Sequence, residues 1–153
     1  MLQDALVSLL ETGLADLAMD RPGRALGAPA VFRAALPSAS DDEEAFPFVV
    51  VRWLEGEDYE ADESMETFAL IIGVYGEEDG DGHAASVAEQ WSMVAASSIR
   101  RLLHGNQTLA GKFSLRFPVN SRKPTPEHQQ ERYHLVTITT KWSAPAPEPL
   151  LEA

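Results

Sequence analysis

The sequence contains no cysteine. Disulfide bridges, thiol catalysis and thiolate metal sites are therefore excluded, and we expect synthesis in a reducing cytoplasm. The chain also lacks an apolar run close to the roughly 18 residues that span a bilayer. The first residues, Met1–Asp4, place no basic stretch ahead of an apolar segment, so we expect no secretory signal and no membrane association.

Basic residues are scarce and unevenly placed. The formal net charge is −12, from 12 basic and 24 acidic residues. Residues 41–89 hold 16 of the acids and a single base, Arg52, so this segment carries −15 and the rest of the chain +3. Tight nucleic-acid binding needs clustered Lys and Arg to displace counterions. We therefore expect no specific nucleic-acid binding, least of all through the acidic segment.

Apolar residues are sufficient for one core. With 153 residues, 44% of them hydrophobic, the chain fits one globular domain. Leucines from Leu2 to Leu17 recur at helical spacing and predict an amphipathic helix over 2–19. A second helix is predicted over 83–104, ended by Gly105. Segments rich in β-branched and aromatic residues predict strands over 46–54, 66–75, 112–117 and 132–142.

These elements define the expected fold. We predict an α+β domain in which one mixed or antiparallel sheet of about four strands packs with two helices, in the order α-β-β-α-β-β. Segment 22–45 is predicted to be a long loop with a short strand at 30–35, and 55–63 a solvated connection. The domain is expected to span residues 1–143. Because prolines cannot donate to a sheet ladder, residues 144–153 are predicted to form an unpaired, Pro-rich tail.

The segment Asp79–His83 is the strongest candidate for a metal site. Its carboxylates alternate with glycines, and such oxygen ligands can wrap Ca²⁺. An EF-hand loop, however, needs a bidentate Glu at its twelfth position, and here that residue is Gln90, inside the second predicted helix. We therefore interpret the segment as a solvated strand-to-helix turn and predict no metal site.

No other motif indicates catalysis or a cofactor. The histidines share no metal-ligand spacing, and no nucleophile-elbow motif is present. His134 is expected at the surface or at an interface, and Trp53 and Trp142 are expected to be partly buried at a sheet face or a subunit contact. Clustered acids in 41–66 are typical of a solvated surface. We predict that the chain is not an enzyme.

Three stretches follow one another in an informative order. The first is the strand Phe46–Arg52, which runs into the acidic segment Glu55–Asp58. The second is Ile71–Tyr75, followed by an acidic turn and a long helix. The third is a short strand, a Pro-containing loop and a Thr-rich strand that ends at Trp142 before the proline-rich tail. Over residues 45–147, this order resembles the tail terminator (tail completion, or minor tail) proteins of long-tailed bacteriophages.

The resemblance implies a structural virion protein with no cofactor and no active site. Such a protein assembles in the host cytoplasm as a homo-oligomeric ring, commonly a hexamer, on the head-proximal end of the tail tube. There it stops tube polymerisation and joins the tail to the head connector and neck proteins, and DNA passes through the ring lumen. The family's functional surface is not a residue motif, so the resemblance assigns no site residues.

The charge asymmetry indicates how copies would associate. An acidic patch on one copy that faces a basic patch on the next would steer a head-to-tail contact. The candidate interface residues are Glu55, Glu57, Asp58, Glu60, Arg116, Arg122, Lys123 and Arg132. Alternatively, the same acids line the lumen and repel passing DNA. Contacts with other tail or neck proteins are expected from loops 22–45, 55–65 and 118–131 and from the tail.

Two other functions fit the same composition. One is a different neck protein, such as a head completion protein. The other is an acidic DNA mimic that inhibits a host protein, which would act as a monomer or dimer. The sequence does not distinguish a contractile tail from a flexible one.

Overall fold

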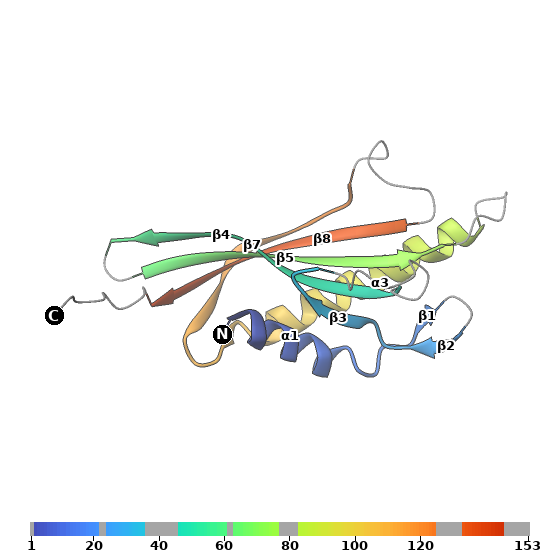
Figure 1. Cartoon of the computed structure of the whole chain (residues 1–153), viewed down its shortest axis with the longest axis horizontal. Coiled ribbons are helices and arrows are strands. Elements are labelled where there is room, and N and C mark those ends of the chain that lie inside the picture. The colour runs from blue at the N-terminus through green and yellow to red at the C-terminus, as the bar shows by residue number, and fades with distance from the viewer. Residues whose placement is uncertain are drawn as a thin grey trace.

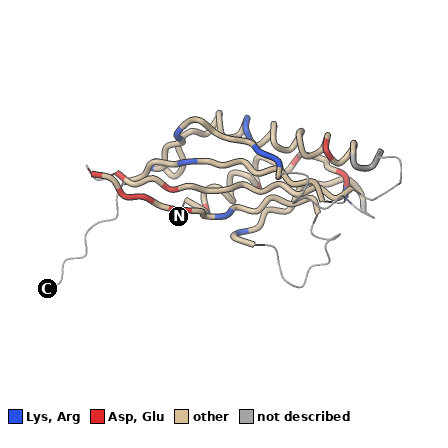
Figure 2. The backbone as a smooth tube through the Cα atoms, turned by 90° about the horizontal axis from the view of Figure 1, so that it is seen from above, with Lys and Arg blue, Asp and Glu red and all other residues tan. Residues whose placement is uncertain are grey.

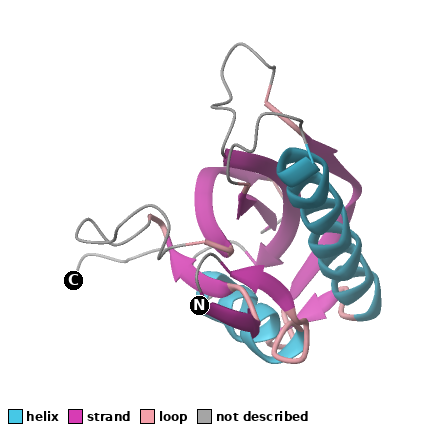
Figure 3. Ribbon diagram, turned by 90° about the vertical axis from the view of Figure 1, so that its right-hand side faces the viewer, coloured by secondary structure: helices cyan, strands magenta, loops and turns pink. Residues whose placement is uncertain are grey.

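The computed structural model describes residues 2–21, 24–35, 46–60, 63–76, 83–124 and 133–145. The fold is α+β: two helices, a curled six-stranded mixed sheet that forms a half-barrel, and a separate two-stranded hairpin (Figures 1 and 3). The elements in chain order are α1 (Leu2–Gly13), β1 (Met19–Arg21), β2 (Arg24–Gly27), β3 (Ala30–Arg33), β4 (Phe48–Tyr59), β5 (Glu63–Tyr75), α3 (His83–Gly105), β6 (Thr108–Leu109), β7 (Phe113–Arg122) and β8 (Tyr133–Pro145).

The main sheet has the strand order β3-β4-β5-β8-β7-β6. Strand β3 runs parallel to β4, and the other neighbours are antiparallel. The predicted α+β class and the order of the long elements are confirmed, but the expected number of about four strands is wrong. The short strand expected at 30–35 is present as β3 and joins the sheet edge, whereas β6, only two residues long, is too short to leave a clear pattern in the sequence.

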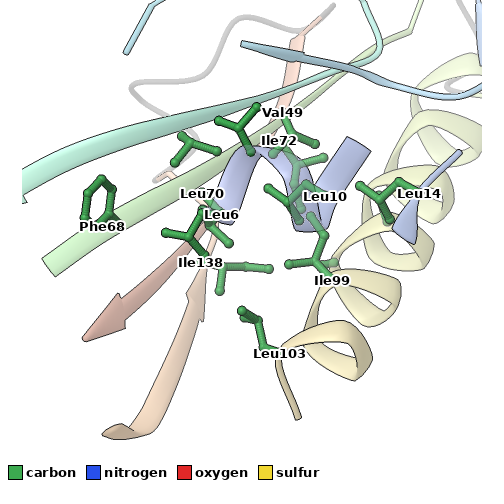
Figure 4. Packing of buried hydrophobic residues seen from close by; sticks show 14 of the residues in the cluster. Leu6, Leu10, Leu14, Val49, Phe68, Leu70, Ile72, Ile99, Leu103 and Ile138 are labelled. Carbon is green, nitrogen blue, oxygen red and sulfur yellow. The ribbon is translucent and has the colours of Figure 1, made fainter. Parts of the chain in front are cut away.

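Both helices pack on one face of this sheet. Apolar residues spaced three or four apart place one stripe of each helix against alternate residues of the strands. Figure 4 shows these side chains converging from α1, α3 and the sheet, among them Leu6, Leu10, Ile99, Leu103, Leu70, Ile72 and Ile138. A smaller cluster, Phe46, Phe48 and Val50 with Tyr75 and Tyr133 packed against it, lies on the other side. The described part of the chain contains no helix long and apolar enough to cross a membrane.

The first helix is shorter than predicted. It ends at Gly13, not near residue 19, and Met19 already begins β1. Gly13 lies against α3 so closely that a β-carbon there would stand 2.5 Å from Leu102 Cδ1. Leu14 and Leu17 continue the apolar pattern without continuing the helix, because they pack on the core from the turn that follows.

The largest difference from the prediction concerns segment 55–63. It is not a loop: β4 continues to Tyr59 and β5 starts at Glu63, so the two strands form a long hairpin. Strand β3 pairs with β4 only as far as Val51. We call the projecting part, Trp53–Tyr59 of β4 with Glu63–Phe68 of β5, the arm; it extends away from the helices in Figure 1.

Two other strands are also longer than predicted. Strand β7 runs through Pro118 to Arg122, so the expected Pro-containing loop does not begin at residue 118. Strand β8 runs to Pro145, because Ala144 and Pro145 pair with Ser64 and Glu63 of the arm. The prediction that residues 144 and 145 pair with no strand is therefore wrong; residues 146–153 lie outside the described ranges.

Candidate assembly surface

The register of the antiparallel strands defines two faces of the sheet. Side chains directly opposite each other on neighbouring strands share a face, and so do residues two apart along one strand. On β5, Phe68, Leu70 and Ile72 belong to the core beneath the helices, so we call their side the helix face. The alternate side chains lie on the opposite side, which we call the far face.

A β-bulge in β4 changes the face on which its side chains lie. Trp53 pairs with Phe68 and therefore lies on the helix face, whereas Glu55 pairs with Thr67 and lies on the far face. The intervening residue, Leu54, has no partner in the ladder. Before the bulge, the odd-numbered residues Val49, Val51 and Trp53 lie on the helix face. After it, the even-numbered residues Gly56 and Asp58 lie on that face.

The four acids predicted as interface residues are divided by this pattern. Glu55 and Glu57 lie on the far face, whereas Asp58 is opposite Ser64 and lies on the helix face. Glu60 is in the turn that follows β4. All four are exposed, at the end of the arm where Figure 2 shows acidic residues gathered. The four acids therefore do not share one face, because a strand alternates its side chains and a loop need not; their role in an interface stays a prediction.

One row of side chains on the far face crosses four strands. Its members are Glu55 on β4, Thr67 on β5, Lys141 on β8 and Arg116 on β7, each directly opposite the next. The acidic end of the row is at the β4 edge, and the basic end is at the β7 edge. Charge therefore changes sign across the width of the sheet, from β4 to β7.

Arg116 already has partners within its own chain. Its Nε donates to Ser143 Oγ at 3.1 Å, and its guanidinium lies 3.1 Å from Glu63 Oε1. Both charged side chains are about half exposed, so solvent screening leaves this ion pair worth at most about 1 kcal/mol. The contact links β7 to the start of β5 across β8, the strand that pairs with both.

The other predicted basic residues lie at or beyond the end of β7. Arg122 ends the strand, is exposed, and makes no ion pair with any residue that the structure describes. Lys123 Nζ lies 2.8 Å from Glu89 Oε1 on α3, and this hydrogen bond, together with the lysine charge, lowers the pKa of the Glu89 carboxyl. Arg132 lies outside the described residues. An intersubunit role for these residues stays a prediction.

Exposed apolar side chains gather on the same two strands, a feature that the sequence did not reveal. Of the seven large hydrophobic residues that the described ranges leave exposed, three belong to the β4 part of the arm and one to β7. They are Trp53, Leu54, Tyr59 and Phe117, with exposed fractions of 56%, 48%, 51% and 51%. Trp53 was expected to be partly buried and Tyr59 to lie in a loop. Aromatic residues that stay exposed on a folded chain are typical of protein–protein contacts.

Two hydrogen bonds hold the arm's aromatic residues in place. Trp53 Nε1 donates to Glu66 Oε2 at 2.6 Å on the helix face. On the far face, the Tyr59 hydroxyl donates to Glu57 Oε2 at 2.7 Å, and this bond raises the pKa of Tyr59. The aromatic rings are therefore presented to solvent in defined positions.

Groups that could support chemistry are few in the described ranges. These ranges contain no cluster of three or more His, Asp or Glu residues able to hold a metal ion. Most of the Asp79–His83 candidate lies outside them; only the backbone of His83, at the start of α3, is described. His104 packs against Phe117, with ring centroids 5.3 Å apart. His134 is buried, so its expected place at the surface is wrong: it lies opposite Val74, on the helix face.

Comparisons with known proteins bear on the fold. No family model matches the chain, and no curated protein is similar to it at a significant level. In structure, the chain is similar to a solved protein whose name states no function, with a TM-score of 0.51, 18% sequence identity, and coverage of 95% of this chain and 98% of that one. At this identity the likeness extends to the fold alone, over nearly the whole of both chains.

Proposed function

We propose that this chain is a tail terminator of a long-tailed bacteriophage, a structural protein of the virion. In this role, copies of the chain form a closed ring, a hexamer by resemblance to the family, on the head-proximal end of the tail tube. The ring ends tube polymerisation and joins the tail to the head connector. The observation that carries the proposal is the pair of unlike sheet edges, one acidic with exposed aromatics and the other basic.

Unlike edges favour a ring over a two-fold dimer. A two-fold contact uses the same surface on both copies, and here that would place Glu55 and Glu57 of one copy beside the same acids of the other. A contact between the two different edges is heterologous, so it leaves a free edge on each side until the assembly closes. A terminator needs such closure, because a ring of fixed size can match the end of a tube.

The proposed role needs no catalytic residue, cofactor or metal. The partners are further copies of the chain, the tail tube protein and the neck proteins, all recognised through shape and charge. Acidic side chains that remain on the lumen side of a ring would repel the DNA backbone, so that DNA passes through without binding. The place of action is the tail–neck region of the virion, after assembly in the host cytoplasm.

Electron microscopy of phage lysates tests the proposal. We expect infection with a phage that lacks this chain to produce abnormally long tail tubes without heads, and complementation to restore tubes of uniform length. Tails of normal length that fail to attach to heads would instead indicate a head completion protein. Normal virions, together with a monomeric chain that binds a basic host protein, would indicate the DNA mimic and contradict the proposal.

A further inference from the structure

Two stretches of sheet edge are open in the described part of the chain. On β4, strand β3 covers the edge only as far as Val51, and no described strand pairs with the outer side of Arg52–Tyr59. On β7, strand β6 pairs with Phe113 and Ser114, and the Leu115 N–H donates to Gln107 O at 2.7 Å, so the open stretch is Arg116–Arg122. An open edge presents unpaired N–H and C=O groups, which makes it a template for another strand.

The two edges match in direction. Strands β4 and β8 each run antiparallel to β5, and β7 runs antiparallel to β8. Strand β7 is therefore antiparallel to β4. A second copy placed beside the first, so that its β4 follows β7 in one continuous sheet, would form an antiparallel pair.

The edges also match in charge on the far face. Glu55 and Glu57 point to this face from β4. From β7, Arg116 lies opposite Lys141 and Arg122 lies opposite Thr137, both on the far face. A continuous sheet keeps far-face side chains on one side, so it would bring two carboxylates beside two guanidinium groups. Opposite charges across a strand pair are stabilising.

Exposed aromatics accompany both edges. Trp53 lies on the helix face of the arm, and Phe117 packs against His104 of α3, on the side of the sheet that carries the helices. Both rings are more than half exposed. Joining the two edges would bring these apolar surfaces towards each other, and aromatic anchors of this kind supply much of the energy of protein interfaces.

We propose that the arm edge of one copy, Trp53–Tyr59, pairs as an antiparallel strand with the β7 edge, Arg116–Arg122, of the next copy. The proposal rests on the ring proposed above and assigns its subunit contact. Segment 36–45 of the same chain is a poor occupant of the arm edge, because its four acids, residues 41–44, would meet Glu55 and Glu57. Pro118 and the irregular register at 117–119 shorten the β7 ladder, which protects this edge from unselective pairing.

A charge-swap experiment tests the contact. Variant A carries Glu55→Lys and Glu57→Lys, so that its arm and its β7 edge are both basic. Variant B carries Asn120→Glu and Arg122→Glu, so that its two edges are both acidic. We expect each variant alone to assemble about tenfold less well than the unaltered chain, and an equal mixture to recover assembly with A and B alternating, as read by native mass spectrometry.

Matched controls carry the same charge changes elsewhere. Glu11→Lys with Asp16→Lys matches variant A, and Gln90→Glu with Arg100→Glu matches variant B; all four positions are exposed. Both controls should assemble like the unaltered chain. If A and B also assemble like it, the inferred contact is wrong while the ring proposal stands. If the unaltered chain assembles neither alone nor on tail tubes, both are wrong.

Cross-linking provides a second measurement that does not depend on charge. Since the chain has no cysteine, Glu55→Cys and Asn120→Cys each introduce a single thiol, at far-face positions that the antiparallel pairing would bring together. A mixture of the two variants, treated with a short bis-maleimide on assembled rings, should give mainly the cross-link between unlike variants. Dominant cross-linking of Glu55→Cys to itself, or no cross-link within intact rings, would overturn the contact. This measurement remains decisive if variants A and B fail to fold.

Discussion

The indole Nε1 of Trp53 donates a 2.6 Å hydrogen bond to Glu66 Oε2, although the Trp53 ring is more than half exposed. The two residues lie on the helix face of the arm, and the bulge at Leu54 is what places Trp53 opposite Phe68 there. An exposed tryptophan that is held in one position loses little side-chain entropy when a partner covers it. Trp53 is thus suited to bind a partner more than to stabilise its own chain.

Replacement of Trp53 by Ala should separate assembly from stability. Because the ring is exposed, we expect the free energy of unfolding to change by less than about 1 kcal/mol. Assembly should weaken by roughly 2 kcal/mol, as for an aromatic anchor. Urea unfolding and native mass spectrometry measure the two effects. Met93→Ala, an exposed apolar residue on α3, is the control; equal losses of assembly in both variants would contradict the role of Trp53.

Replacement of Trp142 by Ala should, in contrast, mainly lower the stability of the folded chain. Trp142 is fully buried on the helix face, and its Nε1 donates to Thr140 Oγ1 at 2.9 Å. Removal of a buried tryptophan leaves a cavity, so we expect a loss of about 3–5 kcal/mol in unfolding free energy. Thermal and urea unfolding measure this loss. A loss as small as that of Trp53→Ala would contradict the packing described here.

The contrast between these two tryptophans shows what the sequence could predict. Continuous apolar runs and helical periodicity located α3, β8 and the inner parts of β4 and β5 to within a few residues. Both tryptophans end such runs and look alike in sequence. Their burial differs because Trp142 is covered in the core, whereas Trp53 lies on the arm, beyond the end of β3. The position of the bulge and the residue at which β3 ends depend on how the strands pair. Local sequence does not encode strand pairing.

The arm was missed for a related reason. Its β4 half is acidic and contains Gly56, a composition that disfavours strands. The strand forms because β5, itself paired with β8 along its whole length, supplies a ladder partner for each residue from Glu55 to Tyr59. The candidate interface residues could be selected from charge alone, but their division between two faces could not.

Replacement of Gly73 by Ala should destabilise the sheet. A β-carbon at this position would lie 2.2 Å from Phe48 Cζ, whose ring is buried against the far face. Such overpacking typically costs about 1–3 kcal/mol. Gly105→Ala is the matched control, because a β-carbon there has open space around it. Urea unfolding of both variants measures the difference; equal stability would show that the aromatic cluster is looser than described.

The contact between Glu89 and Lys123 predicts a pH-dependent contribution to stability. Lys123 lowers the folded-state pKa of Glu89 below its ordinary value of 4.5. The contact therefore stabilises the fold above that value, and its contribution is lost as the pH falls through the folded-state pKa. We expect Glu89→Gln to be slightly less stable than the unaltered chain at about pH 7, and the difference to be smaller at about pH 3. Urea unfolding at both pH values checks this, and a difference that grows in acid would be inconsistent with the ion pair.

Assembly should weaken as salt increases. The proposed contact joins carboxylates and guanidinium groups at exposed edges, and salt screens such charges. We expect the association rate to fall between low salt and about 0.5 M NaCl, with a smaller effect on dissociation. Light-scattering kinetics measure this. Variant A mixed with variant B should show the same dependence, since its contacts also join opposite charges.

The mass of the assembled species tests the central claim most directly. Native mass spectrometry of the full chain, alone and after release from tail tubes, should give one discrete closed oligomer, with six copies expected by resemblance to the family. A chain that stays monomeric or dimeric in both preparations, or that forms open chains of every length, would contradict a ring built from unlike sheet edges.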